Sequence, residues 1–95
     1  MLEKAKIALR VSNTAFDDEI ENLIESAKID LQLAGVKIEV LGVVPDAIIE
    51  RAILTYCKAH FGMANPDSEK YSDSYEHQRT KLSLSGLHNV LKRIY

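Results

Sequence analysis

Apolar residues recur at every third or fourth position over most of the chain, which is the spacing of one face of an α-helix. The clearest such segment covers roughly residues 15–34 and is about 30 Å long. Thr14 can cap its first turn, and Gly35 can close its last turn because glycine reaches a positive φ without a Cβ clash. Its apolar face consists of Phe16, Ile20, Leu23, Ile24, Ala27, Leu31 and Ala34.

Two further helices are predicted between a proline and a glycine. The segment 45–62 starts with Pro45 and ends at Gly62, and its wide apolar face suits the centre of the core. That face consists of Ile48, Ile49, Ala52, Ile53, Tyr56, Cys57 and Phe61. The segment 65–86 starts with Asn65 and Pro66 and ends at Gly86. Its thin stripe of Tyr71, Tyr75, Gln78 and Leu82 leaves most of that helix to water or to a partner.

Shorter helical patterns are found at the two ends of the chain. Residues 2–9 form a predicted helix before a turn at Ser12 and Asn13. After Gly86, the nine residues 87–95, here called the C-terminal arm, are too few to hold a helix together in water. We therefore expect the arm to dock, either on another subunit or on the chain's own core. Its apolar residues at helical spacing are Leu87, Val90, Leu91 and Ile94.

Segment 36–44 carries a different pattern, in which Val36, Ile38 and Val40 alternate with charged residues. Alternation indicates a β-strand, yet no second strand is evident, so this segment is either an apolar loop over the core or an edge that pairs with another chain. The predicted fold is an all-α domain, a small bundle of about four helices with the C-terminal arm and this one apolar loop or short strand. A chain of 95 residues fits a single domain, in which residues 1–86 form the helical body and residues 87–95 form the arm.

Composition excludes several classes of protein. The chain is 46% apolar and 27% charged, which excludes a disordered protein, and the single Cys57 cannot form an internal disulfide. Twelve basic and 14 acidic residues give a net charge of −2, whereas proteins that grip nucleic acid carry a basic excess. No apolar run approaches the ~20 residues that cross a bilayer, and the first residues lack an apolar signal core. We expect a protein that is neither exported nor bound to a membrane.

Candidate catalytic groups are few. Cys57 and His60 lie three residues apart on one predicted helix and could form a thiolate–imidazole pair. The simpler interpretation treats Cys57 as a small buried hydrophobe and His60 as a residue suited to a helix C-terminus. Adding His77 does not produce a recognised zinc-ligand spacing, and no glycine-rich phosphate loop is present. The sequence predicts no enzymatic activity, no metal and no cofactor.

The polar residues allow two other interpretations. The acidic cluster of Asp17, Asp18, Glu19, Glu21 and Glu25 could hold a metal, but a favourable helix start and a solvated face explain it better. A helix-turn-helix regulator that binds DNA is the alternative function, since the helix predicted at 65–86 carries polar and basic residues. That motif needs a short turn of three or four residues between its two helices. Acidic residues at the end of the helix that would approach the bases argue against DNA binding; they are Asp67, Glu69 and Asp73.

Several segments together resemble the head–tail connector (adaptor) proteins of tailed bacteriophages and prophages. The resemblance covers roughly residues 5–86, and it lies in the order and spacing of ordinary helical segments, none of which is a catalytic signature. The segments that carry it are 9–12, 16–20, 27–35, 51–62, 65–71 and 74–86. The C-terminal arm after Gly86 is less typical of that family.

This resemblance implies a small all-helical subunit without enzymatic activity that forms a homo-oligomeric ring under the portal protein. Such a ring extends the DNA channel at the head–tail junction of the virion, after assembly in the host cytoplasm, and docks a head-completion or tail protein. Genomic DNA passes through it without sequence-specific binding. Leu87, Val90, Leu91 and Ile94 are then the candidate assembly interface, toward a neighbouring subunit or the portal.

Charge is distributed unevenly along the chain. Residues 1–50 carry five basic and ten acidic side chains, whereas residues 51–95 carry seven basic and four acidic ones. A strongly basic channel wall would hold DNA and slow its transit, so the acidic half suits the channel. Asp17, Asp18 and Glu21 are the candidate channel-facing residues, and basic residues of the second half remain for assembly contacts.

Overall fold

The computed structural model describes residues 1–36, 47–62 and 66–94, with side chains described as far as Ser83. These residues contain four helices: α1 (Leu2–Leu9), α2 (Asp17–Leu33), α3 (Ala47–His60) and α4 (Ser68–Ile94). No strand is present in the described residues. The all-α prediction with four helices is therefore confirmed.

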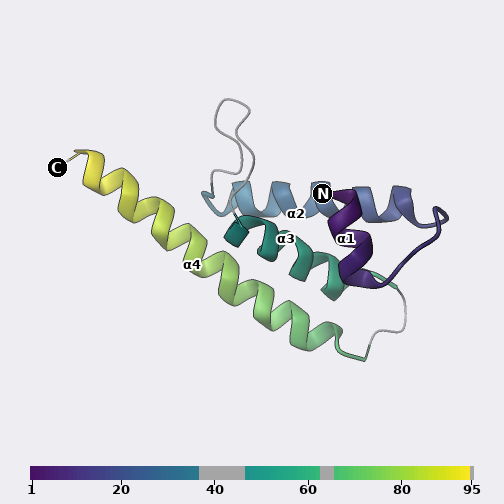
Figure 1. Ribbon diagram of the computed structural model, residues 1–95. Coiled ribbons are helices and arrows are strands. Elements are labelled where there is room, and N and C mark those ends of the chain that lie inside the picture. The colour runs from purple at the N-terminus through teal and green to yellow at the C-terminus, as the bar shows by residue number, and fades with distance from the viewer. Residues whose placement is uncertain (37–46, 63–65, 95) are drawn as a thin grey trace.

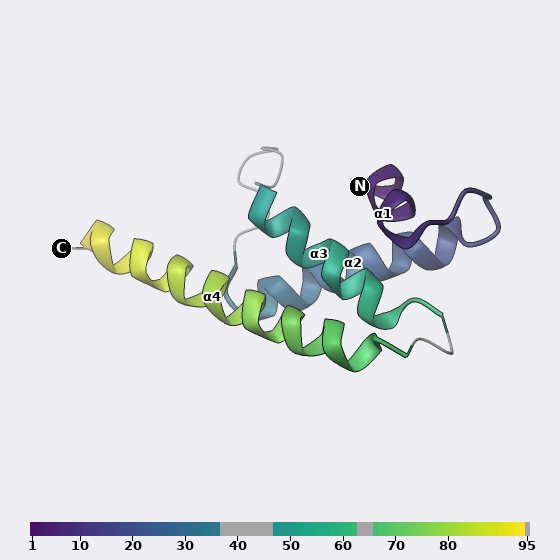
Figure 2. The ribbon, with the colours of Figure 1, turned by 60° about the horizontal axis from the view of Figure 1, so that its bottom comes forward.

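Helix α3 occupies the middle of the bundle, between α2 and α4, and α1 crosses one end (Figures 1 and 2). It is packed against each of the other three helices, and α1 also contacts α2. Of the predicted face of α3, Ile49, Ala52, Ile53 and Cys57 are buried and Tyr56 and Phe61 are half-buried, whereas Ile48 in the first turn is 64% exposed. The core consists of Ala5, Ile20, Ile24, Ala27, Leu31, Val36, Ile49, Ala52, Ile53, Cys57 and Tyr75.

The end of α2 is the one predicted from the sequence. Gly35 has a φ of +91°, its N–H donates to the Gln32 carbonyl at 3.0 Å, and the N–H of Val36 donates to the Leu31 carbonyl at 2.9 Å. This pair of hydrogen bonds is a Schellman motif, which satisfies carbonyl groups that the helix leaves free. Val36 and Leu31 are both buried, so the same motif directs the chain back onto the core. Gly62, with a φ of +82°, follows α3 in the same conformation.

Helix α1 ends with the same pair of hydrogen bonds but without a glycine. Arg10 adopts the left-handed conformation (φ 59°, ψ 41°), its N–H donates to the Ile7 carbonyl, and the N–H of Val11 donates to the Lys6 carbonyl at 2.9 Å. The helix has the bounds predicted from the sequence, residues 2–9, but its ending lacks the usual glycine, because the left-handed position is taken by a residue with a Cβ, which is strained there.

The predicted Thr14 cap of α2 is wrong. The helix begins at Asp17 after Phe16, which makes no side-chain capping hydrogen bond. The Asn13 Oδ1 atom accepts a hydrogen bond from the Ala15 N–H at 3.1 Å, and the resulting turn moves the helix start by two residues. The Phe16 ring packs edge-on against Phe61 with 5.5 Å between ring centroids, which joins this turn to the end of α3.

The predicted helix end at Gly86 is also wrong, because α4 continues through Gly86 to Ile94. A glycine inside a helix costs only about 1 kcal/mol relative to alanine, and residues 87–94 continue the helical spacing with no proline to stop it. The helical residues of the C-terminal arm therefore continue a longer helix, and it extends past α1, α2 and α3 in both views (Figures 1 and 2).

Several predicted features lie outside the described residues. Val36 is buried, but the rest of the segment 36–44, the Pro45 start of α3 and the Asn65 cap of α4 are not described. Pro66 lies in the turn before α4, and the Tyr71 N–H donates to the Asp67 carbonyl at 3.0 Å in its first turn. None of the described helices is both long and apolar enough to cross a membrane.

Gly35→Ala is expected to lower the free energy of unfolding by about 1 kcal/mol, because a Cβ is strained at this positive φ. Nothing lies within 4 Å of the added Cβ, so the cost comes from the backbone alone. Gly35→Asn is the matched control and should lose less, since asparagine tolerates the left-handed conformation. Urea denaturation measures both, and an unchanged midpoint for Gly35→Ala would contradict the proposed cost.

Candidate functional site

Polar side chains connect α2 to α4 on one side of the bundle. The Tyr75 phenol donates to Asp30 Oδ2 at 2.5 Å, and the Arg79 guanidinium lies 3.4 Å from Asp30 Oδ1. One turn further along both helices, the Ser83 hydroxyl donates to the Ala34 carbonyl at 2.6 Å. We call these five residues the α2–α4 link. They are spaced four positions apart on each side: Asp30 and Ala34 at the end of α2, and Tyr75, Arg79 and Ser83 on α4. The link holds α4 in place immediately before it extends past the other helices.

The phenol of Tyr75 is held in its neutral form. Its side chain is 4% exposed, and burial raises its pKa above the ordinary value of 10.0, as do the hydrogen bond to Asp30 and the charge of that carboxylate. Tyr56 packs edge-on against Tyr75 with 5.1 Å between ring centroids, and its pKa is raised by burial and by the Asp30 charge. The two phenols therefore act as a donor and a packing surface, with no proton released near neutral pH.

Sequence reasoning identified only some residues of the α2–α4 link. The stripe of Tyr71, Tyr75, Gln78 and Leu82 faces the bundle, with Tyr75 buried and the others half-buried. Arg79 and Ser83 were missed, although both follow Tyr75 at spacings of four. Spacing by itself shows that these polar residues share a face of the helix, but it cannot show that the face meets α2.

Cys57 and His60 occupy different environments. Cys57 has no exposed surface, and burial raises the pKa of its thiol to about 11, so the thiolate is scarce at neutral pH. The exposed His60 ring lies 4.3 Å from the Tyr56 ring, between centroids. Within the described residues, no group of three histidine, cysteine or acidic side chains could hold a metal ion. A buried neutral thiol suits packing and does not suit nucleophilic attack.

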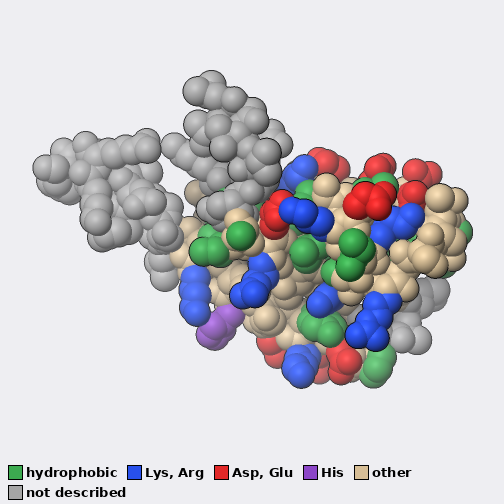
Figure 3. All heavy atoms as spheres, viewed as in Figure 1, with side chains coloured by type: hydrophobic (Ala, Val, Ile, Leu, Met, Phe, Trp, Pro, Cys, Tyr) green, Lys and Arg blue, Asp and Glu red, His purple; other side chains and the backbone are tan. Residues whose placement is uncertain are grey.

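The acidic residues of α2 do not form one site. Asp17 is partly buried and pairs with Lys6 of α1 at 2.9 Å, so it joins two helices. Asp18, Glu19, Glu21 and Glu25 are exposed. Figure 3 shows acidic side chains gathered along the edge of the molecule formed by α2. Of the three predicted channel-facing residues, Asp18 and Glu21 are therefore available to a partner, whereas Asp17 is engaged within the fold.

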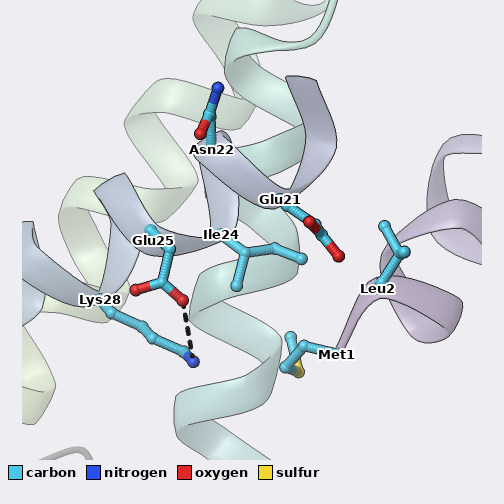
Figure 4. A pocket seen from close by; sticks show the side chains of 7 residues that line it. All are labelled: Met1, Leu2, Glu21, Asn22, Ile24, Glu25 and Lys28. Carbon is cyan, nitrogen blue, oxygen red and sulfur yellow. Dashed lines mark hydrogen bonds and ion pairs between the residues drawn. The ribbon is translucent and has the colours of Figure 1, made fainter. Parts of the chain in front are cut away.

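An open hollow of about 400 Å³ lies between the start of α1 and the middle of α2. Figure 4 shows that Met1 and Leu2 approach it from α1, and that the other lining residues belong to α2. Lys28 is the basic group of the lining and lies 3.5 Å from Glu25. Glu21 and Glu25 outnumber this lysine, so the side chains that line the hollow carry no net positive charge that would attract a phosphate group. It is lined by Met1, Leu2, Glu21, Asn22, Ile24, Glu25 and Lys28.

Comparison with known protein families gives a match. The sequence model of a family described as phage connector protein matches residues 1–88. The chain belongs to this phage connector protein family. No curated protein and no solved structure matches the chain. The resemblance described from the sequence over residues 5–86 is thereby confirmed, and the match includes the first two residues of the C-terminal arm.

The phage connector fold of this chain does not supply helix-turn-helix spacing. Seven residues, 61–67, separate α3 from α4, whereas the motif uses three or four. Asp67 and Glu69 at the start of α4 are exposed. The four apolar residues predicted as an assembly interface, Leu87, Val90, Leu91 and Ile94, lie on the stretch of α4 whose side chains are not described.

Tyr75→Phe is expected to lower the free energy of unfolding by about 1.5 kcal/mol, because it removes a hydrogen bond to a charged acceptor. A phenol whose pKa is raised by folding stabilises the protein below its unfolded pKa, and this stabilisation is lost as pH rises above 10.0. Stability should therefore fall less steeply with alkaline pH in Tyr75→Phe than in the unmodified protein.

Tyr71→Phe, one turn earlier on α4, is the matched control for this change. Denaturant titrations at several pH values between neutral and alkaline conditions measure both variants. Equal stability of Tyr75→Phe and Tyr71→Phe, together with identical pH profiles, would contradict a stabilising role for the α2–α4 link.

Proposed function

We propose that this phage connector protein assembles as a homo-oligomeric ring beneath the portal protein at one vertex of the capsid. The ring extends the channel through which genomic DNA passes and docks a head-completion or tail protein at the head–tail junction of the virion. Membership of the connector family supports this proposal, because the match covers residues 1–88. The chain acts as a structural subunit without enzymatic activity, and Cys57 contributes packing.

The observation that carries the proposal is the length and direction of α4. This helix has 27 residues, and its last turns project beyond the body formed by α1, α2 and α3 (Figures 1 and 2). Subunits of a closed ring meet through two different faces, one on each side of the subunit. A projecting helix on one side and the body formed by the other three helices on the other side are suited to contacts of this kind.

Deleting residues 87–95 should abolish ring formation and leave the stability of the monomer nearly unchanged, because the described contacts of α4 with the body occur up to Ser83. Native mass spectrometry of the protein alone, and mixed with the portal protein of the same phage, measures assembly, and a thermal melt measures stability. A full-length variant with Leu87, Val90, Leu91 and Ile94 changed to serine is the matched control and should lose assembly as well. Normal assembly of both variants, or a large loss of monomer stability, would contradict the role of the arm.

We also propose that Asp18 and Glu21 face the DNA channel, where negative charge keeps the polymer from binding to the wall. Asp18→Asn combined with Glu21→Gln should slow DNA packaging and ejection several-fold, because DNA would then adhere to the less acidic surface. Asp17 is left unchanged, since its loss would also break the ion pair with Lys6. Glu69→Gln, which removes an exposed charge at the start of α4, is the control. Unchanged packaging and ejection rates in the double variant would contradict the channel role.

A further inference from the structure

We propose that residues 87–94 of one copy lie antiparallel along the outer face of α2 in the next copy. This inference deepens the ring proposed above and rests on it, because it names the surface that receives the C-terminal arm. Three observations support it: exposed apolar residues on α2, the order of charge on both segments, and the direction in which α4 leaves its own body.

The outer face of α2 carries large apolar residues that are exposed in the described part of the chain. Ile29 is 55% exposed and Leu33 is 83% exposed, one turn apart near the C-terminal end of the helix. Glu25 lies one turn before Ile29 and is also exposed. Since residues four apart are neighbours on a helix surface, Glu25, Ile29 and Leu33 form one line. Followed from the C-terminal end of α2, this line is apolar first and acidic afterwards.

The arm has the complementary order when followed toward its C-terminus. Leu87, Val90 and Leu91 come first, and Lys92 and Arg93 follow. In an antiparallel arrangement Leu87, Val90 and Leu91 therefore meet Leu33 and Ile29. At helical spacing Arg93 borders this apolar stripe and comes near Glu25, whereas Lys92 falls on the opposite side of the helix. The lengths also agree, because the helix from Leu33 to Glu25 spans about 12 Å and the helix from Leu87 to Ile94 spans about 10 Å.

The occupant of this face is a second copy of the chain. Ser83 is joined to the Ala34 carbonyl of its own α2, and from there α4 continues past the body as one uninterrupted helix (Figures 1 and 2). The arm cannot turn back onto its own α2 without breaking that helix. It reaches only as far as Glu25 of the next copy, which leaves Asp18 and Glu21 for the channel.

Glu25 is able to accept this partner. Its interaction with Lys28 is long, at 3.5 Å, and the Glu25 side chain is exposed, so the pair contributes little stability. A single contact between two short helical segments is small compared with a stable interface, so each is weak alone. Closure of a ring makes many such contacts act together, which is how a weak contact supports a stable assembly.

Intermolecular cross-linking tests the contact directly. Two full-length variants, Glu25→Cys and Arg93→Cys, are mixed and oxidised, and the disulfide-linked heterodimer is quantified. Glu19→Cys, an exposed position on a different side of α2, replaces Glu25→Cys in the control mixture and should give about tenfold less product, since its effective concentration beside the arm is lower. The buried Cys57 is retained in all variants. Equal yields from the two mixtures, or no product from either, would overturn the contact.

A charge exchange and an apolar substitution give independent results. Glu25→Arg should weaken assembly in native mass spectrometry, and adding Arg93→Glu to the same chain should restore it. Leu33→Ser should also weaken assembly, whereas Gln32→Ser, one position away and also exposed, should not. Failure of the exchange to restore assembly, or equal behaviour of the two serine variants, would count against the contact.

The two proposals fail in distinguishable ways. If the unmodified protein forms rings but Glu25→Cys gives no selective cross-link, this contact is overturned and the ring proposal stands. A selective cross-link without any ring, alone or with the portal protein, would support the contact and contradict the ring. The absence of both would overturn both.

Discussion

Burial of one face of α3 is the constraint on which the rest of the structure depends. Ala52, Ile53 and Cys57 have no exposed surface, and α3 is packed against all three other helices. Without α3, the apolar stripes of α2 and α4 would have no common surface, since polar side chains supply the described link between those two helices. A core of this kind in a small domain leaves α4 free to extend beyond it.

Polar contacts decide where α4 points. Apolar packing against α3 is non-directional, whereas the hydrogen bonds from Tyr75 to Asp30 and from Ser83 to the Ala34 carbonyl are specific in distance and angle. The second of these bonds lies three residues before Gly86, where a break in the helix would otherwise be expected. The α2–α4 link therefore sets the direction of the projecting helix, and in the proposed ring that direction determines which surface of a neighbour it can reach.

The acidic residues of the first half of the chain serve different purposes. Asp17 joins α2 to α1 through Lys6, and Asp30 joins α2 to α4. Asp18, Glu21 and Glu25 remain exposed along α2. A net charge of −2 thus conceals a division between carboxylates that hold the helices together and carboxylates that are available to DNA or to a neighbouring subunit.

The sequence by itself determined the helical class, the central position of α3, the end of α2 at Gly35 and the connector family, because these depend on spacing and turn chemistry within short segments. It did not determine that α4 passes through Gly86, since a glycine ends a helix only where the following residues leave the helical path. Tertiary structure decided the partnership of Asp30 with Tyr75 and the exposure of Ile29 and Leu33. This hydrogen bond and these exposures involve residues that are distant in the chain, so they depend on how all the helices pack together.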